Sequence, residues 1–189
     1  MRLFVALDIP DEVRRAIGEM IARLRDVAHG ARWVRAEGVH VTLKFIGEMP
    51  AERVSAIEGA LRGARAAAAV EAKFRGGGFF PNERHPRVFW AGVEASASLR
   101  GLAGDVDRRL SALGIAAETR EFRPHLTLAR FKSEDGLPRL HEEIKKLEPI
   151  DLGSMRASEF YLLQSQLGPG GAKYTKLGTF PFGRADGGA

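Results

Sequence analysis

The stretch HVTL at residues 40–43 recurs as HLTL at residues 125–128. A second pair of segments, RLFVA at 2–6 and RVFWA at 87–91, matches with the same offset of 85 residues (125 − 40 and 87 − 2). Ungapped pairs that share one offset predict an internal duplication, which bears on every later inference about the fold. We therefore expect two halves of similar build in this chain of 189 residues.

The segments around these pairs follow the same order in both halves. Each half opens with a β-branched and aromatic run typical of a buried strand, RLFVAL or RVFWAGV. Apolar residues at helical spacing follow, at Val13, Ile17, Met20, Ile21 and Leu24 and again at Leu99, Leu102, Val106, Leu110 and Leu113. After each motif we expect a further helix, at 51–69 and 138–147, and a further strand, at 70–74 and 156–164. Because the order β-α-β-α-β occurs twice, the sequence predicts an α+β fold with two pseudo-two-fold lobes whose sheets face a central cleft.

The chain length fits one bilobal domain better than separate modules. We expect a single domain over residues 1–189, with the first repeat at about 1–84 and the second at about 85–182. The small and polar residues 183–189 predict a disordered tail.

Glycine, proline and serine mark the expected boundaries of several elements. Segments 75–87 and 167–173 are rich in glycine and proline and are predicted to be surface loops. Ser96 or Ser98 would cap the start of the helix in the second half, and Gly114 would end that helix.

Composition limits the chemistry that this chain can perform. Cysteine is absent, which excludes disulfides, thiolate catalysis and cysteine-ligated metal centres. Asp8 and Pro10 break the apolar run at the N-terminus, so we expect neither a signal peptide nor a membrane span, and a cytoplasmic location. The net charge of +5 favours a polyanionic partner such as nucleic acid, although a basic surface without that role would carry the same charge.

The repeated motif places a histidine and a threonine side by side in each half. Side chains alternate along a strand, so His40 and Thr42 share one face, as do His125 and Thr127. If the halves pack about a pseudo-two-fold axis, the two pairs face each other across the cleft. The sequence therefore predicts a site with two imidazoles and two hydroxyls.

Such a site suits the opening of a cyclic phosphodiester by water, which needs one proton removed and another supplied. A histidine performs either task near neutral pH, and each such group contributes roughly 10²–10⁴ in rate without a metal ion. Threonine hydroxyls can donate to the phosphate oxygens where charge accumulates. A metal site built on His40 and His125 is disfavoured, because no carboxylate lies at ligand-like spacing and threonine binds zinc poorly.

At these motifs the chain resembles the 2H phosphoesterase superfamily, which is named for two H-x-[ST]-x motifs. Within it, the chain is most similar to the bacterial and archaeal RNA 2′,3′-cyclic phosphodiesterases, once described as 2′-5′ RNA ligases. The stretches that carry the resemblance are RLFVALDIP at 2–10, RWVRAEGVHVTLKFIGE at 32–48, FPNERHPRVFWAGV at 80–93 and FRPHLTLARFK at 122–132.

The resemblance implies a hydrolase without metal or other cofactor, which cuts the bond to O3′ and leaves a 2′-phosphate. It implies that His40 is the proton donor, that His125 activates water, and that Thr42 and Thr127 bind the phosphate. The residues by themselves leave open which histidine is the acid and which is the base.

Two further residues carry over from the resemblance, Arg130 as a phosphate contact and Phe45 as a platform on which a base stacks. Strict strand alternation opposes both roles, because Arg130 lies an odd number of residues from His125, as Phe45 does from His40. A strand end or a β-bulge just after each motif would remove the conflict.

Other basic and aromatic residues could form an RNA-binding edge or simply lie at the surface. They are Arg32, Trp33 and Arg35 in the first half and Lys173, Tyr174 and Lys176 in the second. The remaining histidines, His29, His85 and His141, have no partner motif and are predicted to be solvated.

Three functions fit these residues. The first is hydrolysis of an RNA 2′,3′-cyclic phosphate, and the second is 2′-5′ RNA ligation, in which an RNA 5′-hydroxyl replaces water. The third is a non-catalytic module that binds RNA ends, which the paired histidines disfavour because arginine or lysine would keep its charge at every physiological pH. The expected partner is RNA with a cyclic phosphate end, such as a tRNA fragment, and we expect a monomer with no membrane and no obligate protein partner.

Overall fold

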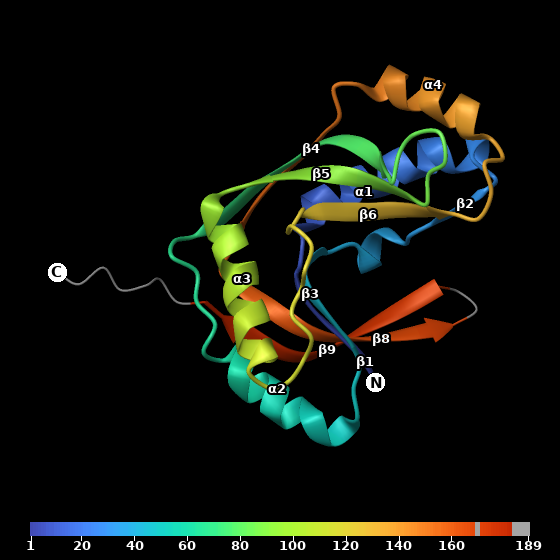
Figure 1. The fold of residues 1–189 in the computed structure, drawn as a ribbon. Coiled ribbons are helices and arrows are strands. Elements are labelled where there is room, and N and C mark those ends of the chain that lie inside the picture. The colour runs from blue at the N-terminus through green and yellow to red at the C-terminus, as the bar shows by residue number, and fades with distance from the viewer. Residues whose placement is uncertain (169–170, 183–189) are drawn as a thin grey trace.

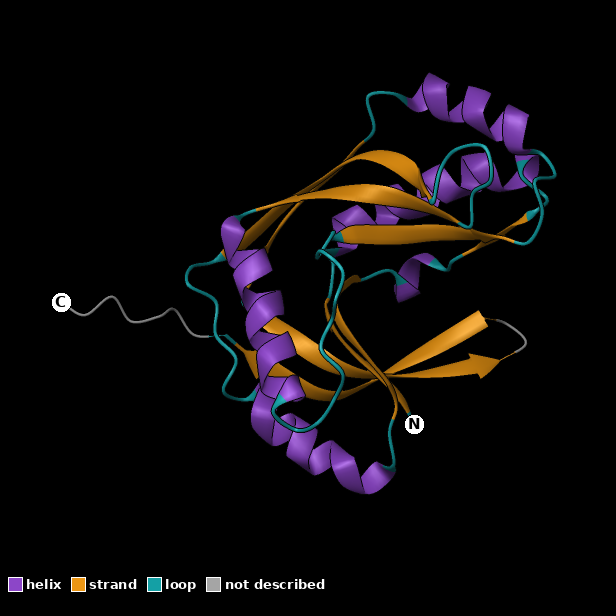
Figure 2. Ribbon diagram, in the orientation of Figure 1, coloured by secondary structure: helices purple, strands orange, loops and turns teal. Residues whose placement is uncertain are grey.

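Two antiparallel β-sheets face each other, and the helices pack on the outside (Figures 1 and 2). The structure is a computed structural model that describes residues 1–168 and 171–182. Within these residues, sheet A contains, in spatial order, β3 (Val41–Glu48), β1 (Arg2–Leu7), β8 (Glu159–Gly168) and β9 (Gly171–Pro181). Sheet B contains β2 (Ala31–Trp33), β6 (His125–Phe131), β5 (Val88–Ala95), β4 (Val70–Phe80) and β7 (Asp151–Ala157). This arrangement confirms the predicted α+β fold with two lobes.

Each sheet combines strands from both halves of the sequence. β8 and β9 of the second half complete the sheet of β1 and β3, while β2 and β4 of the first half join β5 and β6. The offset of 85 residues relates β1 to β5 and β3 to β6, so the orders β3-β1-β8-β9 and β6-β5-β4-β7 correspond strand by strand. The pseudo-two-fold relation therefore holds between two sheets that have exchanged the corresponding strands β4 and β8.

The helices cover the outer faces of the two sheets. α1 (Asp11–Leu24) packs on β7 and on α4 (Leu137–Leu147), beside sheet B (Figure 1). α3 (Ala97–Ser111) contacts α2 (Val54–Leu61) and β3 of sheet A. The predicted apolar face of α1 is buried at all five positions: Val13, Ile17, Met20, Ile21 and Leu24. Full burial of one such side chain contributes about 1.5–3 kcal/mol, which is why these faces determine where the helices dock.

The faces of the sheets that look toward each other are less uniformly apolar than the outer faces. The main core joins the helices to the outer sheet faces and includes Phe74, Phe89 and Phe160, which are fully buried. A separate small cluster of Phe4, Ala6 and Leu163 lies on the inner face of sheet A, with Tyr161 and Tyr174 packed against it. The inner face of sheet A therefore carries aromatic side chains beside the motif strand.

Several predicted boundaries were wrong. Residues 75–80 are not a loop, because β4 continues through them to Phe80 and pairs with β5. Here the glycines do not form a turn but let the Trp90 side chain pack closely against the backbone of β4, since a Cβ atom on Gly78 would lie 2.5 Å from the Trp90 ring. The predicted strand 156–164 is divided between the end of β7 and most of β8.

The helix predicted over 51–69 is shorter than expected. A 3₁₀ turn at Ala51–Arg53 precedes α2, and α2 ends at Leu61. The amide of Arg65, which a longer helix would use internally, donates instead to the Asp105 carboxylate at 3.0 Å. This tertiary hydrogen bond competes with helix continuation in a way that local propensity does not reveal.

The two ends of α3 differ in how well they match the expectation. Ser96 is the residue before the helix, but its hydroxyl makes no capping bond and accepts from the Glu71 amide at 3.3 Å. Gly114 follows the helix with φ of +80°, the left-handed conformation that glycine favours. The predicted loop 167–173 falls largely in β8 and β9, apart from residues 169–170, which like the predicted tail 183–189 lie outside the described residues.

Candidate active site

The two motif histidines occupy equivalent places on the two sheets. His40 lies immediately before β3, and His125 is the first residue of β6. Residues 40–45 and residues 125–130 show the same burial pattern. In each range the order is half-buried, buried, half-buried, buried, buried and exposed, starting from the histidine. Thr42 is thus half-buried beside His40, as Thr127 is beside His125.

A β-bulge follows each motif and changes which side chains share its face. On β3, Thr42 lies opposite Ala6 and Lys44 opposite Val5, so Leu43 is the additional residue. On β6 the corresponding additional residue is Leu128. Each bulge shifts the alternation by one position.

The bulges bring Phe45 and Arg130 onto the faces of the two threonines. Phe45 pairs with Phe4, whose ring centroid lies 6.2 Å away, on the inner face of sheet A. Arg130 pairs with Val88, two positions from the pairing of Trp90 with Thr127. The objection from strict strand alternation is thereby removed, because a bulge stands between each motif and the residue concerned.

Both imidazoles are held by a backbone carbonyl two residues earlier in the chain. His40 Nδ1 donates to the Gly38 carbonyl at 2.7 Å, and His125 Nδ1 donates to the Arg123 carbonyl at 2.8 Å. Because a carbonyl oxygen only accepts, Nδ1 carries a proton in both rings. Nε2 is the nitrogen that remains to take up or release a proton.

Aromatic rings restrict the orientation of both histidines. The His40 ring centroid lies 4.7 Å from that of Phe4 and 5.1 Å from that of Tyr174, which meets it edge-on. The His125 ring is met edge-on by Phe80 at 5.2 Å. The two histidines therefore have similar aromatic surroundings as well as similar hydrogen bonds.

The environment of His40 favours its neutral form. Burial lowers the pKa of His40, while the hydrogen bond to Gly38 and the negative charge of Asp8 act in the opposite direction. The positive charges of Arg14 and of a protonated His125 lower the pKa of His40 further.

A partly buried ionic network supports the turn that precedes His40. Arg14 of α1 donates to the carbonyls of Ala36 and Glu37, at 2.9 and 3.0 Å, and to Asp8 Oδ1 at 2.7 Å. Lys176 of β9 donates to Asp8 Oδ2 at 2.8 Å. Burial would raise the pKa of Asp8, but the hydrogen bonds from Lys176 and Arg14 outweigh it and hold the pKa below its ordinary value.

This network bears directly on the orientation of His40. The carbonyls that Arg14 binds belong to the 3₁₀ turn Ala36–Gly38, and the carbonyl of Gly38 orients the His40 ring. Sequence reasoning missed Arg14 because it lies among the polar positions of an amphipathic helix and has no motif of its own. Its contacts join segments that are 22 and 23 residues apart in sequence.

The other residues considered from sequence fall in different places. Trp33 points into the core, where its ring meets Phe89 edge-on at 6.2 Å, whereas Arg32 lies opposite Arg130 across β2 and β6. Tyr174 contacts His40, and Lys176 lies 3.7 Å above the Tyr161 ring. Lys173 is exposed on β9, and Arg35 is exposed before the 3₁₀ turn. The residues considered for one RNA-binding edge therefore lie in three different places: the inner faces of the sheets, the core and the outer surface.

The three remaining histidines differ in exposure. His29 and His85 are exposed as predicted, and His85 Nδ1 lies 2.6 Å from a Glu134 carboxylate oxygen. The prediction for His141 was wrong, because it is half-buried against Phe79 with 5.0 Å between ring centroids. Its helix, α4, turns that side chain toward the sheet rather than toward solvent.

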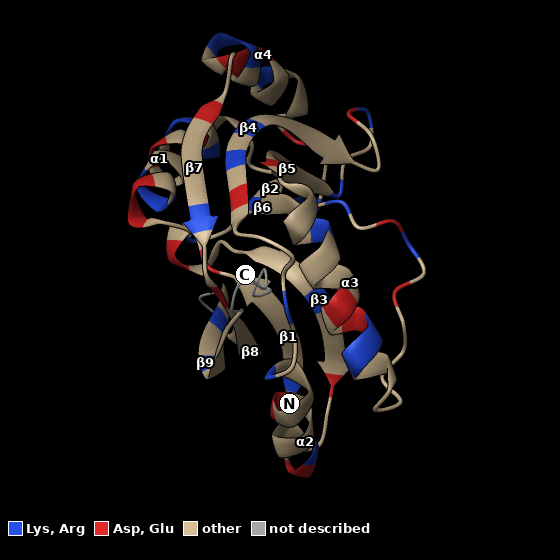
Figure 3. Ribbon diagram, turned by 90° about the vertical axis from the view of Figure 1, so that its left-hand side faces the viewer, with Lys and Arg blue, Asp and Glu red and all other residues tan. Residues whose placement is uncertain are grey.

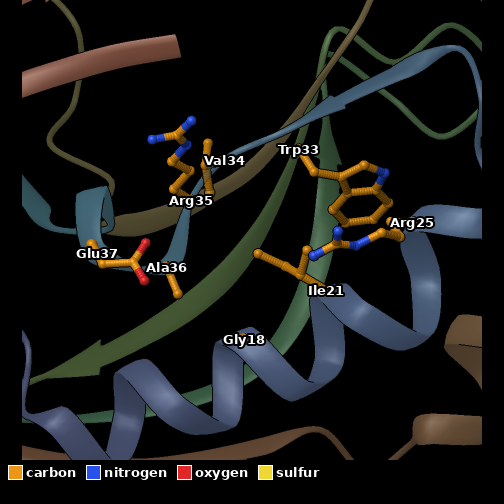
Figure 4. Close-up of a pocket in the computed structure, with 8 residues that line it drawn as sticks. All are labelled: Gly18, Ile21, Arg25, Trp33, Val34, Arg35, Ala36 and Glu37. Carbon is orange, nitrogen blue, oxygen red and sulfur yellow. The ribbon is translucent and has the colours of Figure 1, made fainter. Parts of the chain in front are cut away.

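Two hollows are lined by neither of the motif histidines, His40 and His125. One, of about 420 Å³, lies between α1 and residues 33–37 (Figure 4). Figure 4 shows Trp33, Ile21 and Arg25 together on one side of it, with Arg35 projecting away. The other, of about 750 Å³, adjoins the start of β2 and the end of β6. Over residues 1–168 and 171–182, no three His, Cys, Asp or Glu side chains are grouped so as to hold a metal ion.

The distribution of charge and hydropathy gives two broader facts. Acidic and basic residues are interspersed over α1, α3 and α4 (Figure 3), so the excess positive charge is not gathered on these helices. In the part of the chain that the structure describes, no helix is long and apolar enough to cross a membrane.

The LigT like Phosphoesterase family model matches this chain at residues 7–90 and 92–174. The two stretches begin 85 residues apart (92 − 7), which is also the spacing of the two motifs. Among curated relatives, the RNA 2′,3′-cyclic phosphodiesterase of Methanothermobacter thermautotrophicus is 34% identical over 181 residues, covering 95% of this chain and 98% of that protein. The protein of the same name from Thermus thermophilus is 38% identical over 187 residues, covering 95% and 89%.

Solved structures show the same similarity in three dimensions. The crystal structure of TT0787 of Thermus thermophilus has a TM-score of 0.80 and 36% identity, covering 98% of this chain and 100% of that one. The crystal structure of E. coli LigT complexed with 3′-AMP has a TM-score of 0.77 and 28% identity, covering 96% and 97%. The likeness therefore extends over both lobes.

Proposed function

This chain belongs to the LigT-like phosphoesterase family, and from that premise we propose that it hydrolyses the 2′,3′-cyclic phosphate at the end of an RNA, leaving a 2′-phosphate. The observation that carries the proposal is the pair of equivalent His-x-Thr strands, one on each sheet, with both Nδ1 atoms occupied by backbone carbonyls. That arrangement leaves two Nε2 atoms for proton transfer. Relatives that bear the name RNA 2′,3′-cyclic phosphodiesterase support this substrate.

The chemistry proceeds as one displacement at phosphorus. His125 Nε2 takes a proton from water while the water oxygen forms a bond to phosphorus, and the bond from phosphorus to O3′ breaks. His40 Nε2 gives its proton to O3′, so that one proton enters the protein and one leaves it. Each proton transfer of this kind contributes roughly 10²–10⁴ in rate.

The side chains around the histidines bind the substrate. Thr42 and Thr127 donate to the non-bridging phosphate oxygens, and the guanidinium of Arg130 adds a charged contact there. Phe45, whose side chain is 58% exposed, offers a free ring surface on which the terminal base stacks. E. coli LigT, solved with 3′-AMP, supports the binding of a nucleotide phosphate to this fold.

The proposal extends to the surroundings of the enzyme. We place it in the cytoplasm as a monomer that acts on RNA ends, with tRNA fragments among its substrates and without a metal ion or other cofactor. The absence of cysteine from the sequence is consistent with a reducing compartment.

The deciding experiment is product analysis in the presence of EDTA, with a short RNA that ends in a 2′,3′-cyclic phosphate. We expect the wild type to yield a 2′-phosphate, and His40→Ala and His125→Ala each to lose at least about 10²-fold in kcat. His85→Ala is the matched control, because His85 is exposed and its Nδ1 lies against a carboxylate oxygen of Glu134. Failure of the wild type to turn over this RNA would refute the proposal, as would full activity in either motif variant.

A further inference from the structure

A basic hollow lies where the end of sheet A approaches the β2 edge of sheet B. It has a volume of about 750 Å³, and the residues that line it include His29, Arg32, Lys132 and Ser133, together with Gly168 on β8. None of the acidic residues that the structure describes lines it. The hollow is therefore open to an anionic ligand and is shared between the two sheets.

The hollow is continuous with the motif strand of the second lobe. On the antiparallel strands β2 and β6, Arg32 lies directly opposite Arg130. Directly opposed residues project from the same face with Cβ atoms about 5 Å apart. Because the bulge at Leu128 puts Arg130 on the face of Thr127, positive side chains extend from the threonine to the hollow.

These positive charges are not compensated by the protein. Like charges placed directly opposite on neighbouring strands are destabilising unless an anion lies between them. Arg32, Arg130 and Lys132 take part in none of the ion pairs found among residues 1–168 and 171–182. By contrast, Arg14, Arg75 and Arg109 all have carboxylate partners. The charges beside the hollow are thus available to an external polyanion.

We propose that this hollow binds the phosphates on the 5′ side of the cyclic end, so that the RNA strand leaves the active site over Arg32 and Lys132. The inference rests on the proposed function and adds to it a direction for the strand and a preference for oligonucleotides over a single nucleotide. A single strand supplies one negative charge per nucleotide, which matches a row of separate cations. Arginine binds phosphate through its planar fork and lysine as a point charge, and neither contact depends on the base.

The test compares two substrates that differ only in upstream phosphates, a nucleoside 2′,3′-cyclic phosphate and a short oligonucleotide with the same cyclic end. We expect the double variant Arg32→Ala/Lys132→Ala to raise KM for the oligonucleotide about ten-fold, the size expected of two exposed charged contacts. KM for the single nucleotide should stay unchanged. The slope of log KM against log salt concentration should fall by about 0.7 per lost contact, for the oligonucleotide only.

Arg35→Ala is the matched control, since it removes the same charge from an exposed arginine beside the other hollow. The inference is overturned if Arg35→Ala raises KM for the oligonucleotide as much as the double variant does, or if the double variant leaves that KM unchanged. It is also overturned if KM rises equally for both substrates, because Arg32 would then serve the reacting phosphate. Absence of turnover of both substrates by the wild type would instead refute the proposed function itself.

Discussion

Replacing Lys44 with methionine should destabilise the protein without removing its active site. Lys44 is 5% exposed and lies on the core side of the β3 bulge, where its Nζ donates to Asp107 Oδ1 and to the Ala116 carbonyl, both at 2.5 Å. Methionine keeps most of the apolar stem but leaves the Asp107 carboxylate without its cation. Removing one partner of a buried ion pair costs about 3–5 kcal/mol.

The lower end of that range applies here. The Asp107 side chain remains 25% exposed and keeps the hydrogen bond from the Glu118 amide at 3.1 Å. We therefore expect a loss of about 3 kcal/mol in the free energy of unfolding, equivalent to a fall in Tm of about 6–12 °C for a chain of this size. Urea unfolding followed by circular dichroism measures the loss, provided that the m-value is unchanged.

A double-mutant cycle separates the ion pair from simple loss of packing. Lys44→Met/Asp107→Leu removes both charges, so it should recover part of the stability lost in Lys44→Met. Turnover at room temperature should stay near that of the wild type, because Lys44 faces the core rather than Thr42. A Lys44→Met variant as stable as the wild type would show that desolvation of this pair cancels its attraction, and the reasoning would fail.

Three further changes test other parts of the structure. Asp105→Asn should destabilise the protein at neutral pH. Burial would raise the pKa of Asp105, but hydrogen bonds led by that from Arg109 hold this pKa below 3.8. The ionised carboxylate therefore stabilises the folded protein above pH 3.8, and this contribution disappears as the pH falls through the folded-state pKa. Unfolding curves at several pH values should therefore converge with those of the wild type only in acid. Gly136→Ala should cost about 2–4 kcal/mol in thermal unfolding, because φ is +80° and the new Cβ would lie 2.2 Å from the Val27 carbonyl oxygen. Arg14→Lys replaces a multidentate fork with a point charge, so kcat should fall about ten-fold with little change in KM, and a rise in KM alone would contradict a positioning role.

The features that could be predicted from sequence are those that depend on local spacing. The apolar stripe of α1 is read from residues that lie close together, and the duplication from similar segments that share one offset; the structure contains both. His40 and His125 were found because the same short motif stands twice at equivalent positions. Periodicity of this kind follows from the geometry of helices and strands and needs no knowledge of their partners.

The features that escaped prediction depend on contacts between distant segments. β7 and β9 contain glycines and few apolar residues, and they become strands because β4 and β8 offer edges with which they pair. The exchange of β4 and β8 between the lobes is a choice of partner strand, which local patterns do not encode. The bulges at Leu43 and Leu128 arise in the same way, from the register against β1 and β5.

The two lobes have equivalent motifs but unequal surroundings, and the inequality bears on which histidine gives up a proton. The positions that correspond to Asp8 and Arg14 in the second half are Val93 and Leu99 (8 + 85 and 14 + 85), so the ionic network beside His40 has no counterpart beside His125. The carboxylate of Asp8 favours the protonated form of His40, against the effect of burial, which lowers the pKa of His40. An anionic phosphate bound between the lobes would act in the same direction as Asp8. Because burial outweighs these opposing effects, the pKa of His40 is lowered. A protonated His40 therefore gives up its proton readily, as the proposed donor to O3′ must.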